Sequence, residues 1–159
     1  MTTVAFKDGV MAADSQITDD HSDYRLTDCE KIYRVESCGA LIGQSGADDI
    51  RDILNMFEEI APECGDDLPT QFDLAEMQID FVGLVALADG TLWHVSIEPV
   101  EINADYEWQG SLREIKHKVA AIGSGSHFAL GAMEAGATAQ EAVEIACKFD
   151  IYSSGPKRS

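Results

Sequence analysis

Short, mainly apolar runs of the kind found in β-strands open the chain. Residues 2–6 and 10–13 form two such runs, and the Asp8–Gly9 dipeptide between them predicts a β-hairpin. After a long polar stretch, polar and apolar residues alternate over residues 31–35, and residues 40–42 form an apolar run that ends at a glycine-rich turn. The sequence therefore predicts four strands before the first helix.

The next segment has apolar residues at helical spacing. The stripe predicts a helix that begins near Asp48 and is ended by Pro62 and Gly65. A short second helix is expected over residues 72–77. Acidic residues greatly outnumber basic ones between residues 48 and 80, which indicates either a solvated outer face or an acidic docking surface. The apolar stripe consists of Ile50, Ile53, Leu54, Phe57 and Ile60.

The middle of the chain returns to strand patterns. Residues 81–87 are almost continuously apolar, as in a strand covered on both faces. Asp89–Gly90 predicts a second hairpin that leads into residues 91–95. Residues 100–102 are interpreted as a further short strand and residues 103–111 as a loop.

The last third predicts one strand and two helices. Residues 119–122 form the strand, which runs into a Gly-Ser-Gly-Ser turn, and residues 127–135 form a helix rich in small residues. Thr138 and Glu141 have the spacing of a capping box, which predicts the start of the final helix. We expect Gly131, Ala132 and Ala135 to bring the first helix close to a sheet, and the second helix to bury Ala142, Ile145, Ala146 and Phe149.

Strands and helices come in blocks rather than in alternation, which favours an α+β fold with antiparallel sheets. Two apolar-faced sheets and two helix pairs predict a four-layer αββα sandwich. A chain of 159 residues fits one domain spanning residues 1–159.

The charge balance limits the partners. The chain has 11 Lys and Arg against 29 Asp and Glu, a formal net charge of −18, which argues against nucleic acid or an anionic membrane as the main partner. No apolar run is long enough to cross a bilayer, and the first residues lack the pattern of a signal peptide. The four cysteines show no Cys-x-x-Cys spacing. We therefore expect a cytoplasmic protein with reduced thiols.

Candidate chemistry begins at the second residue. Thr2 is small enough for an aminopeptidase to remove Met1 before it, which would place a hydroxyl and a free α-amine on one residue. A terminal amine has a pKa near 8, so a useful fraction is neutral at pH 7 and can accept the hydroxyl proton. A threonine activated by its own amine is a known type of nucleophile.

Several segments then resemble the proteasome β-subunit family of N-terminal nucleophile hydrolases, in order and in rough spacing. Within that family the short chain is most similar to the bacterial HslV-type peptidase subunit. The resemblance spans nearly the whole chain and implies the four-layer fold. The segments are residues 2–6, 11–16, 30–33, 43–48 and 122–131, followed by residues 139–142 and 150–155.

The resemblance implies a threonine-type endopeptidase with defined catalytic roles. Thr2 matches the nucleophile, Lys31 the cation that lowers the pKa of its hydroxyl, and Asp14 the acid that pairs with this lysine. Ser124 matches a serine near the terminal amine, and Asp150 with Ser153 the pair that supports it. For two of these residues a purely structural role stays open as the alternative to a catalytic one. Asp14 would then be a turn carboxylate, and Lys31 an exposed lysine of a sheet.

Substrate contacts and an ion site are implied in the same way. Gly46 matches the glycine whose N–H binds the oxyanion, with Gly43 as the alternative, and Gln44 and Ser45 match the lining of a substrate pocket. Hydrolysis itself needs no cofactor. The backbone carbonyls of Cys147, Asp150 and Ser153 match positions that hold a sodium, magnesium or calcium ion in the bacterial relatives.

The resemblance also implies an assembly. We expect a homo-oligomeric ring, hexameric or heptameric and single or double, that degrades unfolded protein substrates, with an AAA+ ATPase unfoldase as a candidate partner. A catalytically inactive ring subunit that serves as a scaffold or binding module is the main alternative. An amidase of the same fold that acts on a small amide is another.

Overall fold

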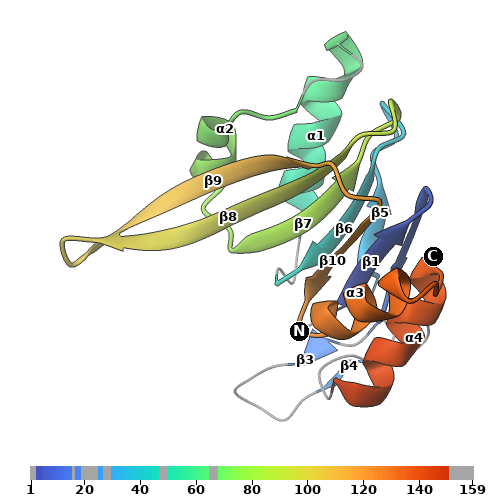
Figure 1. Ribbon diagram of the computed structural model, residues 1–159. Coiled ribbons are helices and arrows are strands. Elements are labelled where there is room, and N and C mark those ends of the chain that lie inside the picture. Colours follow the sequence, from blue (N-terminus) through green and yellow to red (C-terminus); the bar gives the residue numbers. More distant parts are fainter. Residues whose placement is uncertain are drawn as a thin grey trace. The chain divides into compact units, whose positions relative to one another are not determined.

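The computed structural model describes residues 3–15, 17–18, 25–26, 30–46, 50–64 and 68–150. These residues divide into two compact units, shown together in Figure 1. The first unit draws on Met1–Tyr33, Gly43–Ser45 and Lys116–Ser159, and the second on Arg34–Ile42 and Gly46–Ile115. Each unit is therefore built from segments that are distant in the sequence.

The first unit contains an antiparallel sheet with the strand order β10-β1-β2. These strands are β1 (Thr3–Lys7), β2 (Val10–Ala13) and β10 (Val119–Gly123). Asp8 and Gly9 connect β1 to β2 with φ angles of 52° and 78°. Two successive residues with positive φ make the type of turn that matches the twist of a hairpin, so the predicted Asp-Gly hairpin is confirmed.

Helices α3 (Ser126–Glu134) and α4 (Ala139–Phe149) cover one face of this sheet. Small side chains let the helices approach the strands closely. On α3, Ala129 and Met133 are buried and Ala132 packs against the core, whereas Gly131 and Ala135 are exposed, so the predicted contact face was right only at Ala132. The core between the helices and the sheet consists of Ala5, Ala12, Ala129, Met133, Ala139, Ala142, Val143 and Ala146.

Two sets of hydrogen bonds hold the connection between α3 and α4. The Lys7 ammonium donates hydrogen bonds to the carbonyl oxygens of Met133 at 3.0 Å and Ala137 at 2.8 Å. Met133 lies in the last turn of α3, where the helix dipole favours a cation, and the Lys7 ammonium links this turn to Ala137 in the connection. The predicted capping box is confirmed, since Thr138 accepts a hydrogen bond from the Glu141 nitrogen and Glu141 accepts one from the Thr138 nitrogen.

A second, larger sheet has the strand order β5-β6-β7-β8-β9. It is built from β5 (Ile32–Arg34), β6 (Leu41–Ser45), β7 (Phe81–Ala86), β8 (Leu92–Ile102) and β9 (Asp105–Ile115). Strand β7 carries the fully buried Phe81, Leu84 and Val85, as expected for a strand with covered faces. The short strands β3 (Ile17–Thr18) and β4 (Arg25–Leu26) pair separately within the predicted polar stretch.

Helices α1 (Arg51–Cys64) and α2 (Gln71–Glu76) belong to the second unit. The α1 stripe is buried at Ile53 and Phe57, as predicted. Pro62 and Gly65 were expected to end this helix; α1 continues past Pro62 and ends at Cys64, directly before Gly65. The Glu58 carboxylate accepts hydrogen bonds from the Glu36 and Ser37 nitrogens. These bonds hold the turn between β5 and β6. The Ser37 side chain, followed by the two backbone N–H groups, lowers the pKa of Glu58.

The interpretation of residues 100–111 was wrong. Strand β8 runs without a break from Leu92 to Ile102, and β9 occupies most of the expected loop. The reversal needs only Asn103 and Ala104, with φ angles of 51° and 68°. The result is a long hairpin in place of a short strand and an irregular loop.

The described residues thus form an α+β fold with two main antiparallel sheets and flanking helices, which agrees with the predicted fold class at this level. Within these ranges, no helix has both the length and the apolar character that crossing a bilayer requires.

Candidate active site

A buried ion pair lies where β2 ends. Asp14 follows β2 directly and Lys31 precedes β5, and the Lys31 nitrogen lies 3.0 Å from the Asp14 carboxylate oxygen Oδ1. The side chains are 0 % exposed for Asp14 and 2 % exposed for Lys31. The alternative interpretation of Lys31 as an exposed sheet lysine is therefore wrong. Two charges that are withdrawn from water persist only when each compensates the other.

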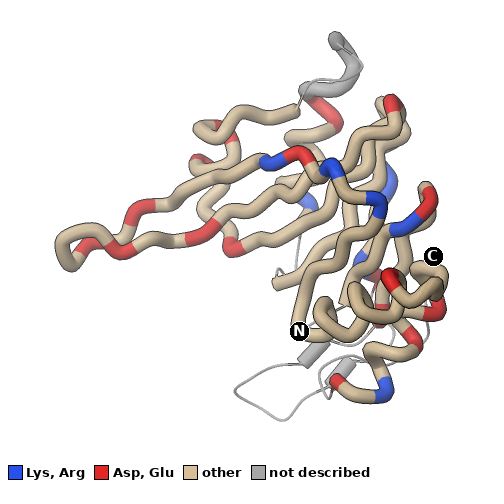
Figure 2. Tube along the Cα trace, viewed as in Figure 1, with Lys and Arg blue, Asp and Glu red and all other residues tan. Residues whose placement is uncertain are grey.

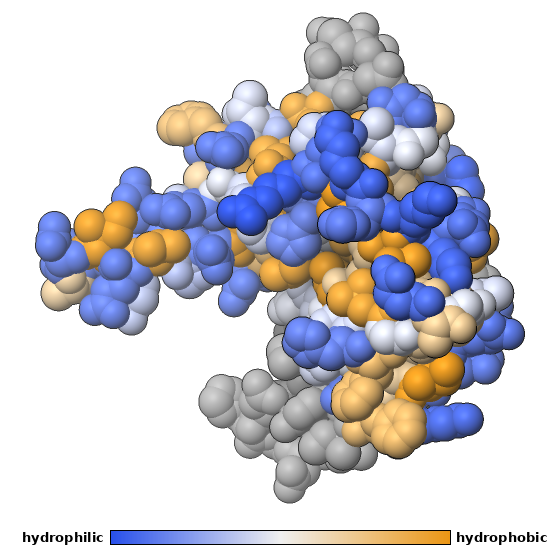
Figure 3. Space-filling view, viewed as in Figure 1, coloured by the Kyte–Doolittle hydropathy of each residue, from blue (hydrophilic) through white to orange (hydrophobic). Residues whose placement is uncertain are grey.

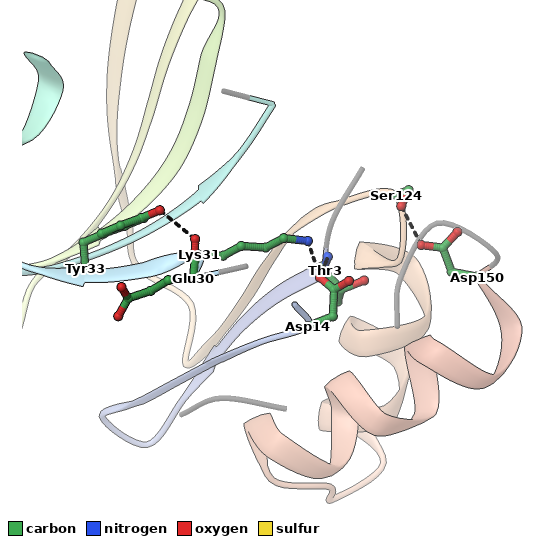
Figure 4. A network of polar contacts seen from close by, with 7 residues as sticks. All are labelled: Thr3, Asp14, Glu30, Lys31, Tyr33, Ser124 and Asp150. Atoms are coloured by element: carbon green, nitrogen blue, oxygen red, sulfur yellow. Dashed lines mark hydrogen bonds and ion pairs between the residues drawn. The ribbon is translucent and has the colours of Figure 1, made fainter. Parts of the chain in front are cut away.

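The same carboxylate oxygen holds the start of β1. The Thr3 backbone nitrogen donates a hydrogen bond to Asp14 Oδ1 at 2.9 Å, and the Asp14 nitrogen donates one to the Thr3 carbonyl at 3.1 Å (Figure 4). Asp14 Oδ1 thus accepts from a backbone N–H and from the Lys31 ammonium. Thr3 is fully buried. Sequence reasoning missed Thr3, because its contact depends on how the two strands end.

The glycine-rich turn after β10 packs tightly on Thr3. Gly123 pairs with Thr3 in the β1–β10 register, so the turn begins beside the first described residue of β1. A Cβ on Gly125 would overlap the Thr3 hydroxyl oxygen and would lie 3.1 Å from the Ala146 Cβ. Only glycine fits there without displacing Thr3 or α4. Sequence reasoning noted this turn but did not find the requirement for Gly125.

Ser124, in the same turn, binds Asp150. The Ser124 hydroxyl donates a hydrogen bond to Asp150 Oδ2 at 2.5 Å (Figure 4). Asp150 immediately follows α4, and its nitrogen donates to the Ala146 carbonyl at 2.8 Å, which fixes the residue at the helix end. The structure therefore brings together two site residues, Ser124 and Asp150, that the sequence separates by 26 positions.

Strand β6 contributes the residues assigned to the pocket and the oxyanion. Gln44 and Ser45 are buried, and the Gln44 nitrogen donates a hydrogen bond to the Lys31 carbonyl at 2.9 Å. A Cβ on Gly43 would lie 2.6 Å from the Val4 side chain, so packing alone requires a glycine at Gly43. Gly46 follows the strand with a φ of 99°, a conformation that favours glycine.

The remaining assigned residues are placed only in part. Thr2 and Ser153 lie outside the described residues. Cys147 lies in the last turn of α4 and Asp150 follows the helix, so two of the three residues assigned to a carbonyl-bound ion are described. Among the described side chains, no three His, Cys, Asp or Glu residues gather as a metal site would require.

Neither a protein-family model nor a curated protein sequence matches this chain. The chemistry of the site therefore depends on the side chains themselves. Within the first unit, they comprise a buried cation, a carboxylate that anchors the first described strand, and a second carboxylate bound to a serine in the turn beside that strand.

Proposed function

We propose that this protein is an N-terminal threonine peptidase that degrades unfolded polypeptides inside a ring assembly, with Thr2 as its nucleophile and the four-layer αββα sandwich as its fold. One observation carries the proposal: the carboxylate of the buried Asp14–Lys31 pair also binds the Thr3 nitrogen. Withdrawing a lysine and an aspartate from water is costly even when they pair. A nucleophile on the residue before Thr3 would give this buried cation a chemical role as well as a structural one.

The covalent chain supports this assignment. The carbonyl carbon of residue 2 is bonded to the Thr3 nitrogen, and consecutive Cα atoms are about 3.8 Å apart. That nitrogen lies 2.9 Å from the oxygen that the Lys31 ammonium also contacts. In the proposed site the Thr2 hydroxyl lies near this cation, because a positive charge close to a hydroxyl favours its deprotonated form.

The proposed reaction has two halves. The Thr2 hydroxyl oxygen attacks the peptide carbonyl carbon, and its proton passes to the α-amine that loss of Met1 exposes. The carbon–nitrogen bond of the substrate then breaks, the amine returns the proton to the leaving nitrogen, and the acyl group remains as an ester on Thr2. A water molecule, deprotonated by the same amine, hydrolyses the ester and restores the hydroxyl.

The other residues of the site have supporting roles in this proposal. Lys31 supplies charge without accepting a proton, and Asp14 keeps it in place. Ser124, held by Asp150, orients the α-amine, with Ser153 as the second member of the supporting pair. The Gly46 N–H stabilises the oxyanion, while Gln44 and Ser45 line a polar pocket for the substrate side chain.

The first test is a chemical label. Intact mass will show whether Met1 is removed, and a peptide that carries an electrophilic group should form an adduct that peptide mapping places on Thr2. We expect hydrolysis of fluorogenic peptides by the wild-type protein and by Thr2→Ser, and none by Thr2→Ala. An unmodified Thr2 in protein without Met1, under conditions where a proteasome control reacts, would contradict the proposal.

The same experiment separates the alternatives. Retention of Met1 would block the amine and leave the inactive ring subunit as the surviving hypothesis. Hydrolysis of small amides without cleavage of peptides would favour the amidase. A requirement for an AAA+ ATPase would appear as cleavage of short peptides but not of folded proteins. Dependence of the peptidase activity on added cations would support the proposed carbonyl-bound ion.

A further inference from the structure

The long β8–β9 hairpin extends past the part of the sheet that supports it. Strand β7 pairs with β8 only as far as the Phe81–Ile97 pair. Beyond that point, Glu98–Ile102 pair with β9 alone among the described residues, and we refer to residues 98–109 as the arm. Two strands without a third strand or a covering helix have little stability of their own in water.

The arm exposes apolar side chains along one face. Tyr106 is 73 % exposed, and the register places it opposite Glu101, on the same face as the Pro99–Trp108 pair. Gly110 lies on the same face of the hairpin. Helix α2 covers the face at this residue, as shown by the 2.6 Å that would separate a Cβ on Gly110 from the Leu74 Cβ. The apolar face is therefore covered by α2 at Gly110 and exposed to solvent farther along the arm.

The arm is also acidic throughout. It contains Glu98, Glu101, Asp105 and Glu107, and no Lys or Arg occurs between Leu92 and Leu112. Figure 2 shows acidic positions without basic ones along the arm, and Figure 3 shows hydrophobic residues near the tip of the hairpin among hydrophilic ones. The register places Glu101 on the face of Tyr106 and Trp108, and Glu98, Asp105 and Glu107 on the opposite face. An arm with aromatic side chains on one face and negative charge on both fits a partner surface that is apolar and basic.

The first unit of the same chain carries such a surface. Lys116, His117 and Lys118 are consecutive and exposed in the connection that leads into β10. We refer to these three residues, Lys116–Lys118, as the basic patch. Its lysine stems provide apolar contact area beneath the positive charges.

We propose that the arm of one copy of this protein binds the basic patch of a second copy. Like copies of a chain with a net charge of −18 repel one another, so association requires local pairing of opposite charges. The chain supplies both partners of that pairing. A contact between two different surfaces of identical chains is heterologous, and repetition of it closes a ring or produces a filament.

The contact between the arm and the basic patch goes beyond the proposed function, because it specifies which surfaces join the copies. It is tested by the mass of the assembly rather than by peptide cleavage. The experiment compares the wild type with two charge reversals, Glu101→Lys/Glu107→Lys on the arm and Lys116→Glu/Lys118→Glu on the patch. A third variant combines all four changes. Glu36→Lys/Glu144→Lys alters the net charge as the arm variant does, at exposed positions outside both surfaces. Glu36 follows β5, at the opposite edge of the sheet from β9.

Native mass spectrometry and light scattering give the oligomeric state of each variant at equal concentration. We expect the wild type and the Glu36→Lys/Glu144→Lys control to assemble, each reversal to shift the protein to monomers, and the combined variant to regain most of the assembly. Mixing the two reversal variants should also restore assembly, in a ring or filament in which they alternate. The Lys arm of one variant then meets the Glu patch of the other, and the remaining arm and patch keep their wild-type charges. Circular dichroism establishes that each variant is folded.

Three results would overturn the proposal. A monomeric wild type would show that the arm does not bind a second copy, and a partner of a different sequence would then be its ligand. Reversal variants that assemble as the wild type does would show that these surfaces are not the contact. If the variant with all four changes is folded but does not assemble, the arm and the patch do not contact each other. None of these results bears on whether Thr2 is a nucleophile, which the adduct experiment tests separately.

Discussion

The ammonium nitrogen of Lys31 lies 3.0 Å from the carboxylate of Asp14, and water reaches almost none of either side chain. Removal of one partner leaves the other as an uncompensated buried charge, which costs about 3–5 kcal/mol. We therefore expect Lys31→Met and Asp14→Asn each to lower the free energy of unfolding by about that amount. Urea denaturation of each variant measures it.

The double variant separates stability from catalysis. Asp14→Asn/Lys31→Met has no buried charge at this place, so it should be more stable than the worse of the two single variants. Its peptidase activity should nevertheless remain absent, because the cation beside residue 2 is lost. Single variants whose stability lies within 1 kcal/mol of the wild type would contradict the importance of the pair for the fold.

Gly125 should tolerate no side chain. Its Cβ would overlap the Thr3 hydroxyl, so Gly125→Ala must displace either β1 or α4, at a cost of about 1–3 kcal/mol. The matched control is Gly131→Ala, which lies within α3 with no atom near the added methyl group. There alanine should stabilise the protein by about 0.5–1 kcal/mol, since it favours the helix. Equal effects at the two positions, measured by thermal or urea unfolding, would argue against the tight contact.

His94 should make the stability depend on pH near neutrality. Burial lowers the pKa of His94, and the Arg113 guanidinium lowers it further from the position opposite on β9. The unfolded chain then binds a proton near pH 6.5, where the folded chain does not. Stability should therefore be full above pH 6.5 and fall as the pH drops below that value toward the lower folded pKa.

Urea unfolding at pH 7.5, 6.5 and 5.5 tests this dependence. We expect His94→Gln to be less sensitive to pH than the wild type over this range, and Arg113→Gln to lie between the two. A wild type and a His94→Gln variant with parallel pH profiles would show that this imidazole does not contribute. Below pH 5 the free energy of unfolding also depends on the carboxylates, which titrate there.

The turn at the tip of the β8–β9 hairpin should be improved by glycine. Ala104 has a φ of 68°, a left-handed conformation that costs an L-residue about 1–2 kcal/mol. We expect Ala104→Gly to raise the free energy of unfolding by about 0.5–1 kcal/mol. Ala132→Gly within α3 is the contrasting control, and it should lower stability by about 1 kcal/mol. Destabilisation by both changes would show that Ala104 is not strained.

Local signals with a chemical basis were read correctly from the sequence. The Asp8–Gly9 hairpin and the Thr138–Glu141 capping box are confirmed, because each depends on residues within four positions of one another. A second capping box, between Thr70 and Asp73, was not predicted, since the usual pattern has Glu or Gln in place of the Asp. The long arm was missed because Asn103–Ala104 lacks the glycine of a typical hairpin turn and Pro99 interrupts the strand pattern.

The candidate site could be predicted only where the resemblance supplied it. No periodicity links Asp14 to Lys31 or Ser124 to Asp150, yet the structure joins both pairs. Thr3 and Gly125 were missed, because their contact arises from the packing of two strands and a turn that are distant in the chain. The exposed Phe149, which stacks on Phe128, was wrongly assigned to the buried face of the final helix, since helical spacing alone does not show where a covering surface ends.

The pairing of β1 with β10 has a consequence during synthesis. Thr3 finds its strand partner, Gly123, only after the ribosome has made most of the chain, which takes roughly 6–24 s at the usual 5–20 residues per second. Until then the beginning of the chain cannot complete its sheet. An enzyme that trims nascent N-termini therefore has this interval to act before β1 gains β10 as its second neighbouring strand.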